Sequence, residues 1–259
     1  MDVNMINRLK EQISIFDDLE NEQLAFGDGP ISIESFCSCR FPIVVILQEP
    51  YTDEDTFQKY LRGELPRPNT AEDKKTYDSM NHWLSIEGRC YGYNTYLTLV
   101  SIINQVMKGS GYYEKCYDAK AYSNFIQNTA ILNVKKIPSI GVQSSQGYKQ
   151  WLKNEQNIKY MSSQVLTYKP KLVLLANITN FLLKSQSENE DVLLFGKKIK
   201  YPNSFISVKG NRIFYDEDTL FIDTTHFSRV SNQKKTEIIE LAITWKDNNK
   251  SNIYKFKKE

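Results

Sequence analysis

Four short runs of apolar residues constrain the fold of this 259-residue chain more than any other feature. Each run is rich in Ile, Val, Leu or Phe and is flanked by segments in which apolar residues recur at helical spacing. Continuous apolar runs of this kind are typical of parallel strands that are buried on both faces. We therefore predict an α/β fold, a three-layer sandwich in which helices flank a central, mostly parallel four-stranded sheet. The predicted strands are Ile43–Leu47, Thr129–Val134, Leu172–Ala176 and Leu220–Asp223.

The segments between these runs predict the helices. The clearest helix covers Thr95–Met107 and ends at a Gly-Ser-Gly sequence. Further helices are predicted over Tyr148–Leu166, Asn180–Lys184 and Gln233–Trp245. Residues 192–215 contain two turn signals and predict hairpin or irregular structure.

The composition favours one globular domain over residues 1–259. Apolar residues make up 41% of the chain, which is enough to form a large core. We expect a helical N-terminal extension at about 1–30 and a polar C-terminal tail at about 248–259. The net charge of +2 neither indicates nor excludes a nucleic-acid partner.

Membrane, metal and cofactor functions find no support in the sequence. No apolar stretch reaches the roughly 18 to 20 residues that span a bilayer, and the N-terminal residues lack the apolar block of a signal peptide. We therefore expect a cytoplasmic protein with no membrane partner. The four cysteines have irregular spacing that fits neither a disulfide framework nor a standard metal site, so we expect no metal and no cofactor.

Polar residues follow the predicted strands at the points where the strands end. The first strand is followed by Gln48–Tyr51, the second contains Asn133 near its end, and the last is soon followed by His226. The carboxyl ends of parallel strands face the position where ligands bind in open α/β sheets. We therefore expect these side chains to meet in one site. The loop segment Gly88–Gly92 precedes the second strand and contains Tyr91.

This series of segments resembles the uracil-DNA glycosylase superfamily. In the classical branch of that family, the first strand ends in Gly-Gln-Asp-Pro-Tyr-His and a Gly-x-x-Phe-Ser loop carries an aromatic residue. A later strand ends in Leu-Asn, and a late loop reads His-Pro-Ser-Pro-Leu-Ser. The order and approximate spacing of these motifs recur here over about residues 43–230. The resemblance implies a uracil-DNA glycosylase-like fold and a monomeric DNA repair enzyme that flips a base out of DNA and excises it.

Carried over position by position, the resemblance assigns a role to each matching residue. It makes Glu49 the carboxylate that activates water and His226 the donor to the leaving base. Tyr91 would stack on the flipped base, and Asn133 would read its edge. The base-binding positions are Gln48, Tyr51, Tyr91 and Asn133. The DNA-binding positions, which would press into the space that the base leaves, are Ser228, Arg229, Val230 and Ser231.

Hydrolysis of an N-glycosidic bond needs these residue types. Cleavage builds positive charge on the sugar and negative charge on the departing base. A carboxylate near the sugar and a hydrogen-bond donor near the base therefore both stabilise the transition state. Since the bond cannot be reached in a stacked duplex, the flipped base needs an aromatic surface and a polar group that reads its edge.

The chain departs from the family motifs at positions that would contact the base or the duplex. Glu49 stands where the family has Asp, and Leu47 and Thr52 replace Gly and His. Phe227 and Arg229 replace the two prolines of the late loop, and Arg229 could itself act as a wedge or a phosphate contact. The substrate is therefore expected to be a uracil-like or otherwise modified base.

Two other functions stay open at this stage. A non-enzymatic member of the same fold would bind abasic or modified DNA as a sensor. The spacing Asp223-x-x-His226 also occurs in ester hydrolases of the Gly-Asp-Ser-Leu type, which need a nucleophilic serine soon after the first strand. No serine stands in Gln48–Pro50, which disfavours the hydrolase. Asn133 also has a structural reading as a turn residue, and His226 has one as a buried histidine.

Overall fold

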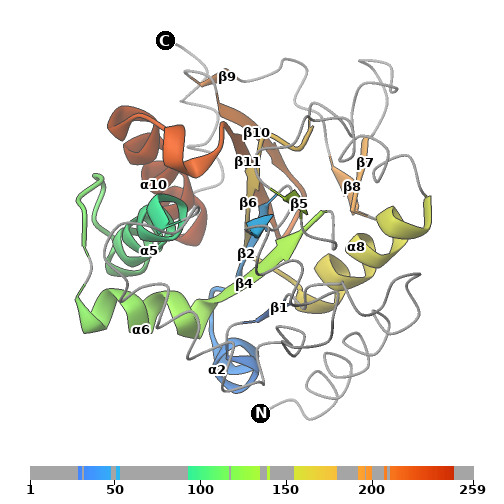
Figure 1. The fold of residues 1–259 in the computed structure, drawn as a ribbon, viewed down its shortest axis with the longest axis horizontal. Helices are drawn as coiled ribbons and strands as arrows, with labels where there is room; N and C mark the ends of the chain where they lie inside the picture. The colour runs from blue at the N-terminus through green and yellow to red at the C-terminus, as the bar shows by residue number, and fades with distance from the viewer. Residues whose placement is uncertain are drawn as a thin grey trace.

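One sheet with helices on both faces organises the chain (Figure 1). The computed structural model describes residues 29–30, 32–47, 51–52, 93–116, 118–134, 139–140, 155–179, 192–195, 197–199, 207–208 and 211–247. The predicted N-terminal extension, apart from its last residues, and the C-terminal tail lie outside these ranges. The α/β class predicted from the sequence is confirmed.

The centre of the sheet consists of the four predicted strands. They are β2 (Ile43–Leu47), β4 (Thr129–Asn133), β6 (Leu172–Ala176) and β11 (Leu220–Thr224). They lie in the order β4-β2-β6-β11, and each adjacent pair is parallel. All their residues except Asn133 are buried, which explains why these strands appear in the sequence as apolar runs.

The prediction of a mostly parallel, four-stranded sheet is wrong in its strand count and in its strand directions, because the sheet is mixed. Within the described ranges, the sheet has seven strands, because three antiparallel strands extend its two sides. Strand β1 (Gly29–Pro30) pairs with β4, β10 (Asn211–Tyr215) pairs with β11, and β9 (Ser207–Val208) pairs with β10. Two of these strands have only two residues, too few to produce a periodic pattern in the sequence. Strand β1 also occupies the end of the segment that we predicted to be helical.

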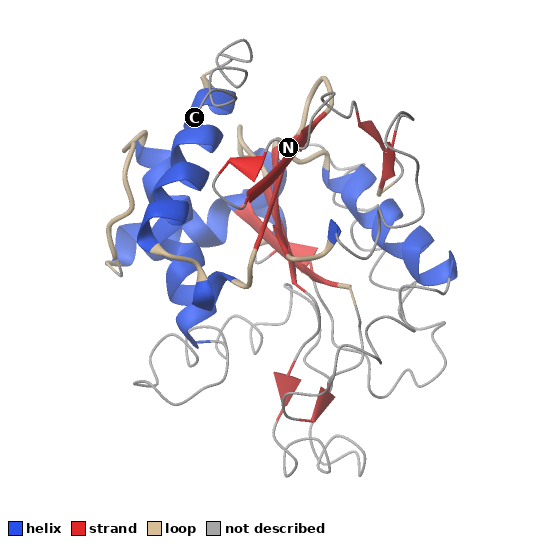
Figure 2. Ribbon diagram, turned by 90° about the horizontal axis from the view of Figure 1, so that it is seen from above, coloured by secondary structure: helices blue, strands red, loops and turns tan. Residues whose placement is uncertain are grey.

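Helices form a layer on each face of the sheet (Figure 2). One layer contains α5 (Tyr93–Lys108), α6 (Ala119–Asn128) and α10 (Asn232–Lys246). The other contains α8 (Glu155–Tyr168), joined by Phe36 of α2 (Ile33–Ser38). Helices α5 and α10 confirm two predictions, and α8 confirms the later part of a third. Helices α2 and α6 were not predicted.

The alternation of side chains along the strands divides the core in two. Ile43 and Val45 of β2 face α5, α6 and α10, whereas Val44 and Ile46 face α8. Both cores contain fully buried aromatic side chains, such as Phe125 in the first and Phe36 in the second. A sheet that is buried on both sides leaves only its edges for chemistry.

Residues 180–191 lie outside the described ranges, and with them the predicted helix Asn180–Lys184. The hairpin structure expected over residues 192–215 is confirmed. Strands β7 (Val192–Leu194) and β8 (Lys197–Ile199) form a two-stranded antiparallel sheet, and β9 and β10 follow. None of the described helices is both long enough and apolar enough to cross a bilayer.

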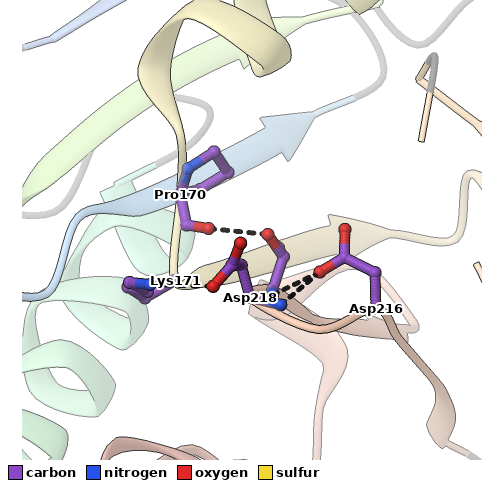
Figure 3. A network of polar contacts seen from close by, with 5 residues as sticks. Pro170, Lys171, Asp216 and Asp218 are labelled. Atoms are coloured by element: carbon purple, nitrogen blue, oxygen red, sulfur yellow. Dashed lines mark hydrogen bonds and ion pairs between the residues drawn. The ribbon is translucent and has the colours of Figure 1, made fainter.

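A network of polar contacts fixes the amino edge of the sheet, where the parallel strands begin (Figure 3). The Asp216 carboxylate accepts hydrogen bonds from the backbone N–H groups of Asp218 (2.7 Å) and Thr219 (2.6 Å). The Thr219 hydroxyl donates to the carbonyl of Pro170 (2.8 Å), and Lys171 pairs with Asp218 at 3.4 Å. These contacts hold the turn between β10 and β11 against the start of β6.

The opposite side of the sheet, where the parallel strands end, is here called the carboxyl edge. Helix α10 starts beyond this edge, after β11, and Lys246 at its far end donates to the carbonyls of Val106 (2.6 Å) and Met107 (3.3 Å). Helices α5 and α10 therefore run in the same direction, and both begin at the carboxyl edge. Strands β3 (Tyr51–Thr52) and β5 (Ser139–Ile140) pair in parallel in the segments that follow β2 and β4 at this edge.

Candidate functional site

The strand order predicts where along the carboxyl edge a ligand would bind. Counted along the chain, the four parallel strands lie in the order second, first, third, fourth. The connection after β2 leads to β4, which lies on one side of β2. The connection after β4 leads to β6, which lies on the other side of β2. The switch point, at which the direction of the connections reverses, therefore lies between β2 and β6. In open sheets of this order, ligands bind beyond the strand ends at this point.

Two rows of residues across the parallel strands determine which side chains lie near this edge. The final row consists of Asn133, Leu47, Ala176 and Thr224. The row before it consists of Leu132, Ile46, Leu175 and Asp223. The final row faces α5 and α10, and the row before it faces α8. The final row thus has a polar residue at each end, Asn133 and Thr224. The row before it is apolar except for the carboxylate of Asp223 at its end.

Asp223 is the most elaborately bonded of these residues. Its carboxylate accepts hydrogen bonds from the backbone N–H groups of Ile178 (3.1 Å) and Thr179 (2.9 Å) and from the Thr179 hydroxyl. The guanidinium of Arg212, whose Cα is opposite that of Asp223 on β10, donates to the Thr179 hydroxyl at 3.3 Å. Burial raises the pKa of Asp223, whereas the bonds from Thr179 and Ile178 and the charge of Arg212 act to lower it.

This bonding pattern does not support the ester hydrolase. Such an enzyme would use the Asp223 carboxylate to orient the ring of His226. In the structure both carboxylate oxygens of Asp223 bind the segment after β6, and Nδ1 of His226 instead contacts the Ser228 hydroxyl. The spacing between the two residues therefore has a structural explanation, in which Asp223 connects the end of β11 to the end of β6.

His226 lies just beyond the end of β11, where it precedes the short helix η3 (Phe227–Arg229). Its ring is partly buried, and Nδ1 lies 2.8 Å from Oγ of Ser228. Burial lowers the pKa of His226, and the positive charge of Arg229 lowers it further. The imidazole is therefore neutral at pH 7, with Nδ1 engaged by Ser228.

We expect Arg229→Ala to move the pKa of His226 part of the way back toward its usual value of about 6.5, since one of the two causes of the shift is removed. NMR titration can follow the ring directly, because the chain has only two histidines. The pKa of His226 is lowered in the folded protein and about 6.5 in the unfolded chain. Between these two pKa values the unfolded chain binds the proton more readily than the folded protein does. The contribution of His226 to folding stability is therefore lost as the pH falls through this window. Arg229→Lys keeps the charge and should leave the pKa low. An unchanged pKa in Arg229→Ala would show that this charge does not act on the ring.

The structure places some of the other predicted base-binding residues. Asn133 ends β4 in the final row, directly beside Leu47, and is partly exposed. Tyr51 belongs to β3 through its backbone, although its side chain lies outside the described set. Gln48, Glu49 and Tyr91 fall outside the described residues. Asn133 and His226 thus lie on the same carboxyl edge, at or beyond the ends of the two outer parallel strands, and Leu47 leads into Gln48 and Glu49 at this edge.

The predicted DNA-binding segment divides into two parts. Ser228 and Arg229 have exposed side chains at the surface of η3. Val230 is only 5% exposed and packs in the core with α5 and α10, so the prediction that it presses into a duplex does not fit its position. The hydroxyl of Ser231 accepts a hydrogen bond from the Lys234 N–H (3.3 Å) and caps α10. Within this segment, only the residues with exposed side chains can therefore reach DNA.

Two buried hydroxyl groups lie between α5 and the sheet near the same edge. Oγ1 of Thr224 in the final row and Oγ1 of Thr95 in the first turn of α5 are each buried and have no hydrogen-bond partner within the described part of the chain. Thr95 shares a helical face with Leu99 and Ile102, which belong to the core on this side of the sheet. An unsatisfied buried hydroxyl costs about 1 to 3 kcal/mol.

The described ranges contain no cluster of three or more His, Cys, Asp or Glu residues able to hold a metal ion. Cys37, Cys39 and Cys116 form no disulfide bond within the described ranges, and Cys90 lies outside them. Burial raises the pKa of Cys39 to about 11, which keeps its thiol protonated and unreactive.

Sequence reasoning missed the residues that surround the Asp223 carboxylate. Arg212 and Thr179 are 11 and 44 residues away from Asp223, and no local pattern connects them. Asn177, directly after β6, adopts a left-handed backbone conformation with a φ of 57°. Its position after an apolar run was the one available signal. No protein-family model matches the chain, and a comparison with curated proteins also gives no match.

Proposed function

We propose that this protein is a DNA glycosylase of the uracil-DNA glycosylase type, which hydrolyses the N-glycosidic bond of a flipped uracil-like or modified base in DNA. One observation carries the proposal: the chain brings Asn133, the end of β2 and His226 to one edge of a parallel sheet, at and beside its switch point. The motif residues Gln48 and Glu49 follow β2 directly in the sequence. This is the edge at which the fold class binds its ligands.

The dimensions of the edge suit a nucleoside. The ends of β4 and β11 are three strand spacings apart, about 14 Å. A nucleoside bound between them would have Asn133 on one side and His226 on the other, with Glu49 following β2, one of the two strands between them. Such an arrangement would allow Glu49 to act at the sugar while Asn133 contacts the base edge and His226 its departing oxygen.

The state of His226 also supports the proposal. The Ser228 hydroxyl can donate to Nδ1, and in that tautomer the neutral imidazole carries its proton on Nε2. Nε2–H would then donate to the oxygen of the base on which negative charge develops. The lowered pKa of His226 makes a neutral donor available at pH 7. The exposed Arg229, next to this site, would contact a phosphate of the DNA backbone.

The Ser228–His226 contact also favours a second candidate, a serine hydrolase that differs from the Gly-Asp-Ser-Leu type because Ser228 itself would be the nucleophile. A hydroxyl 2.8 Å from an imidazole nitrogen is the geometry of a nucleophile and its base. In that case a fluorophosphonate probe should label Ser228 in the purified protein and fail to label Ser228→Ala. A glycosylase has no reason to react with the probe.

Mass spectrometry of free bases tests the glycosylase directly. The purified protein is incubated with uracil-containing DNA and with DNA that carries natural base modifications. We expect release of one base by the wild type and its loss in Glu49→Gln, which removes the carboxylate. Glu217→Gln is the matched control, because Glu217 is exposed in the turn between β10 and β11, at the opposite edge. If the protein bound DNA but released no base, the glycosylase proposal would be overturned in favour of a non-enzymatic protein that senses abasic or modified DNA.

A further inference from the structure

The backbone of Asn177 has an unusual conformation at the switch point. Asn177 follows Ala176, the last residue of β6, and its φ of 57° lies in the left-handed region. Residues other than glycine occupy this region at a cost of about 1 kcal/mol or more, although Asn tolerates it better than most. The residue stands directly beyond one of the two strands between which the direction of the chain connections reverses. It is also partly exposed, unlike the buried residues on either side of it.

A buried network holds this conformation in place. The two backbone N–H groups that follow Asn177, those of Ile178 and Thr179, both donate to Asp223. Asp223 is 2% exposed and Thr179 fully buried, and Arg212 donates to the Thr179 hydroxyl. Removing a carboxylate from water is costly unless it is fully hydrogen-bonded. The bonds to Asp223 therefore fix the backbone directly after Asn177.

We propose that Asn177 is a specificity-determining residue whose side-chain amide contacts the ligand at the switch point, and that Asp223, Thr179 and Arg212 are the positioning residues that hold it there. The proposal rests on the proposed function, under which the ligand is a flipped base. Rigidly held backbone of uncommon conformation is a recurrent feature of ligand-binding segments.

The chemical class of the ligand follows from the amide. An amide offers an acceptor and two donors side by side, which suits a planar heterocycle that presents a donor next to an acceptor. Asn133 and Asn177 flank β2 at the ends of β4 and β6, two strand spacings or about 10 Å apart. A base bound beyond β2 would therefore be read along two of its edges, once by each amide.

The test uses three variants of the full-length protein. Asn177→Gly keeps the left-handed backbone and removes the amide, whereas Asn177→Asp keeps the shape and replaces the donors with an acceptor. Lys169→Gly is the matched control, since Lys169 also has a positive φ (44°) but lies before β6, at the opposite edge. Calorimetry measures the affinity for uracil, thymine, cytosine and adenine, and fluorescence anisotropy measures the affinity for a duplex with one abasic-site analogue.

We expect Asn177→Gly to lower the affinity for the preferred base by at least about fivefold. We expect Asn177→Asp to change which base binds most tightly. Lys169→Gly should change neither, and duplex affinity should stay within about twofold of wild type in every variant, because phosphate contacts supply most of it. Unchanged base affinity in Asn177→Gly, with the wild type binding bases, would overturn the role of Asn177 and leave the proposed function intact. A wild type that binds neither bases nor duplex would overturn both.

The positioning role has its own readout. Asp223→Asn keeps the size of the side chain but replaces one accepting oxygen with a donor that faces the backbone N–H groups. We expect it to weaken base binding when Asn177 is present and to have no further effect in the Asn177→Gly background, with folding of each variant verified by circular dichroism. Equal losses in both backgrounds would mean that Asp223 acts on the fold as a whole and does not position Asn177.

Discussion

Replacing Asp223 with alanine is expected to lower the free energy of unfolding by about 3 to 5 kcal/mol. The substitution leaves the N–H groups of Ile178 and Thr179 without an acceptor in a buried position. It also removes the negative charge that faces Arg212 across the β10–β11 pair. A buried donor that loses its acceptor costs its full desolvation free energy. This substitution leaves several buried donors without an acceptor at once.

Urea denaturation monitored by circular dichroism measures this loss. Asp218→Ala is the matched control, because it is the same substitution at an exposed residue of the turn that begins β11. Its ion pair with Lys171 is solvent-exposed at 3.4 Å, so we expect a change of no more than about 0.5 kcal/mol. Similar losses in the two variants would show that the hydrogen bonds of Asp223 contribute no more than a surface charge.

The four central strands could be predicted because burial on both faces leaves a direct trace in the sequence. Each apolar run was located to within one residue of its strand. Helix α6 left a weaker trace, since only three of its ten residues are buried and one of these is Asn128. Its start could still have been recognised from Asp118, whose carboxylate accepts a hydrogen bond from the Ala121 N–H at 2.7 Å and caps the helix. The edge strands depend on pairing partners that a single sequence does not identify.

The candidate site could be predicted only where chemistry coincides with a strand end. The positions of Asn133 and His226 at the carboxyl edge were predicted in this way, because Asn133 ends an apolar run and His226 follows one. Thr179 and Arg212 were not, because their significance comes from contacts with Asp223 that span the fold. The conformation of Asn177 also leaves no trace, since Asn is common in turns of every type. Val230 was predicted to contact DNA because it belongs to a motif expected at the surface, but its side chain packs in the core.

Replacing His226 with alanine is expected to slow base release by about 100- to 1,000-fold, the usual effect of removing one preorganised donor to a developing oxyanion. The rate should be measured under single-turnover conditions on whichever DNA the wild type cleaves, with duplex affinity measured alongside. Affinity should change little, because the donor acts on charge that exists only in the transition state. His82→Gln, which alters the only other histidine, should retain the wild-type rate. If His226→Ala instead weakened DNA binding and left the rate at saturation unchanged, the ring would belong to the duplex contact, and another group would have to stabilise the departing base.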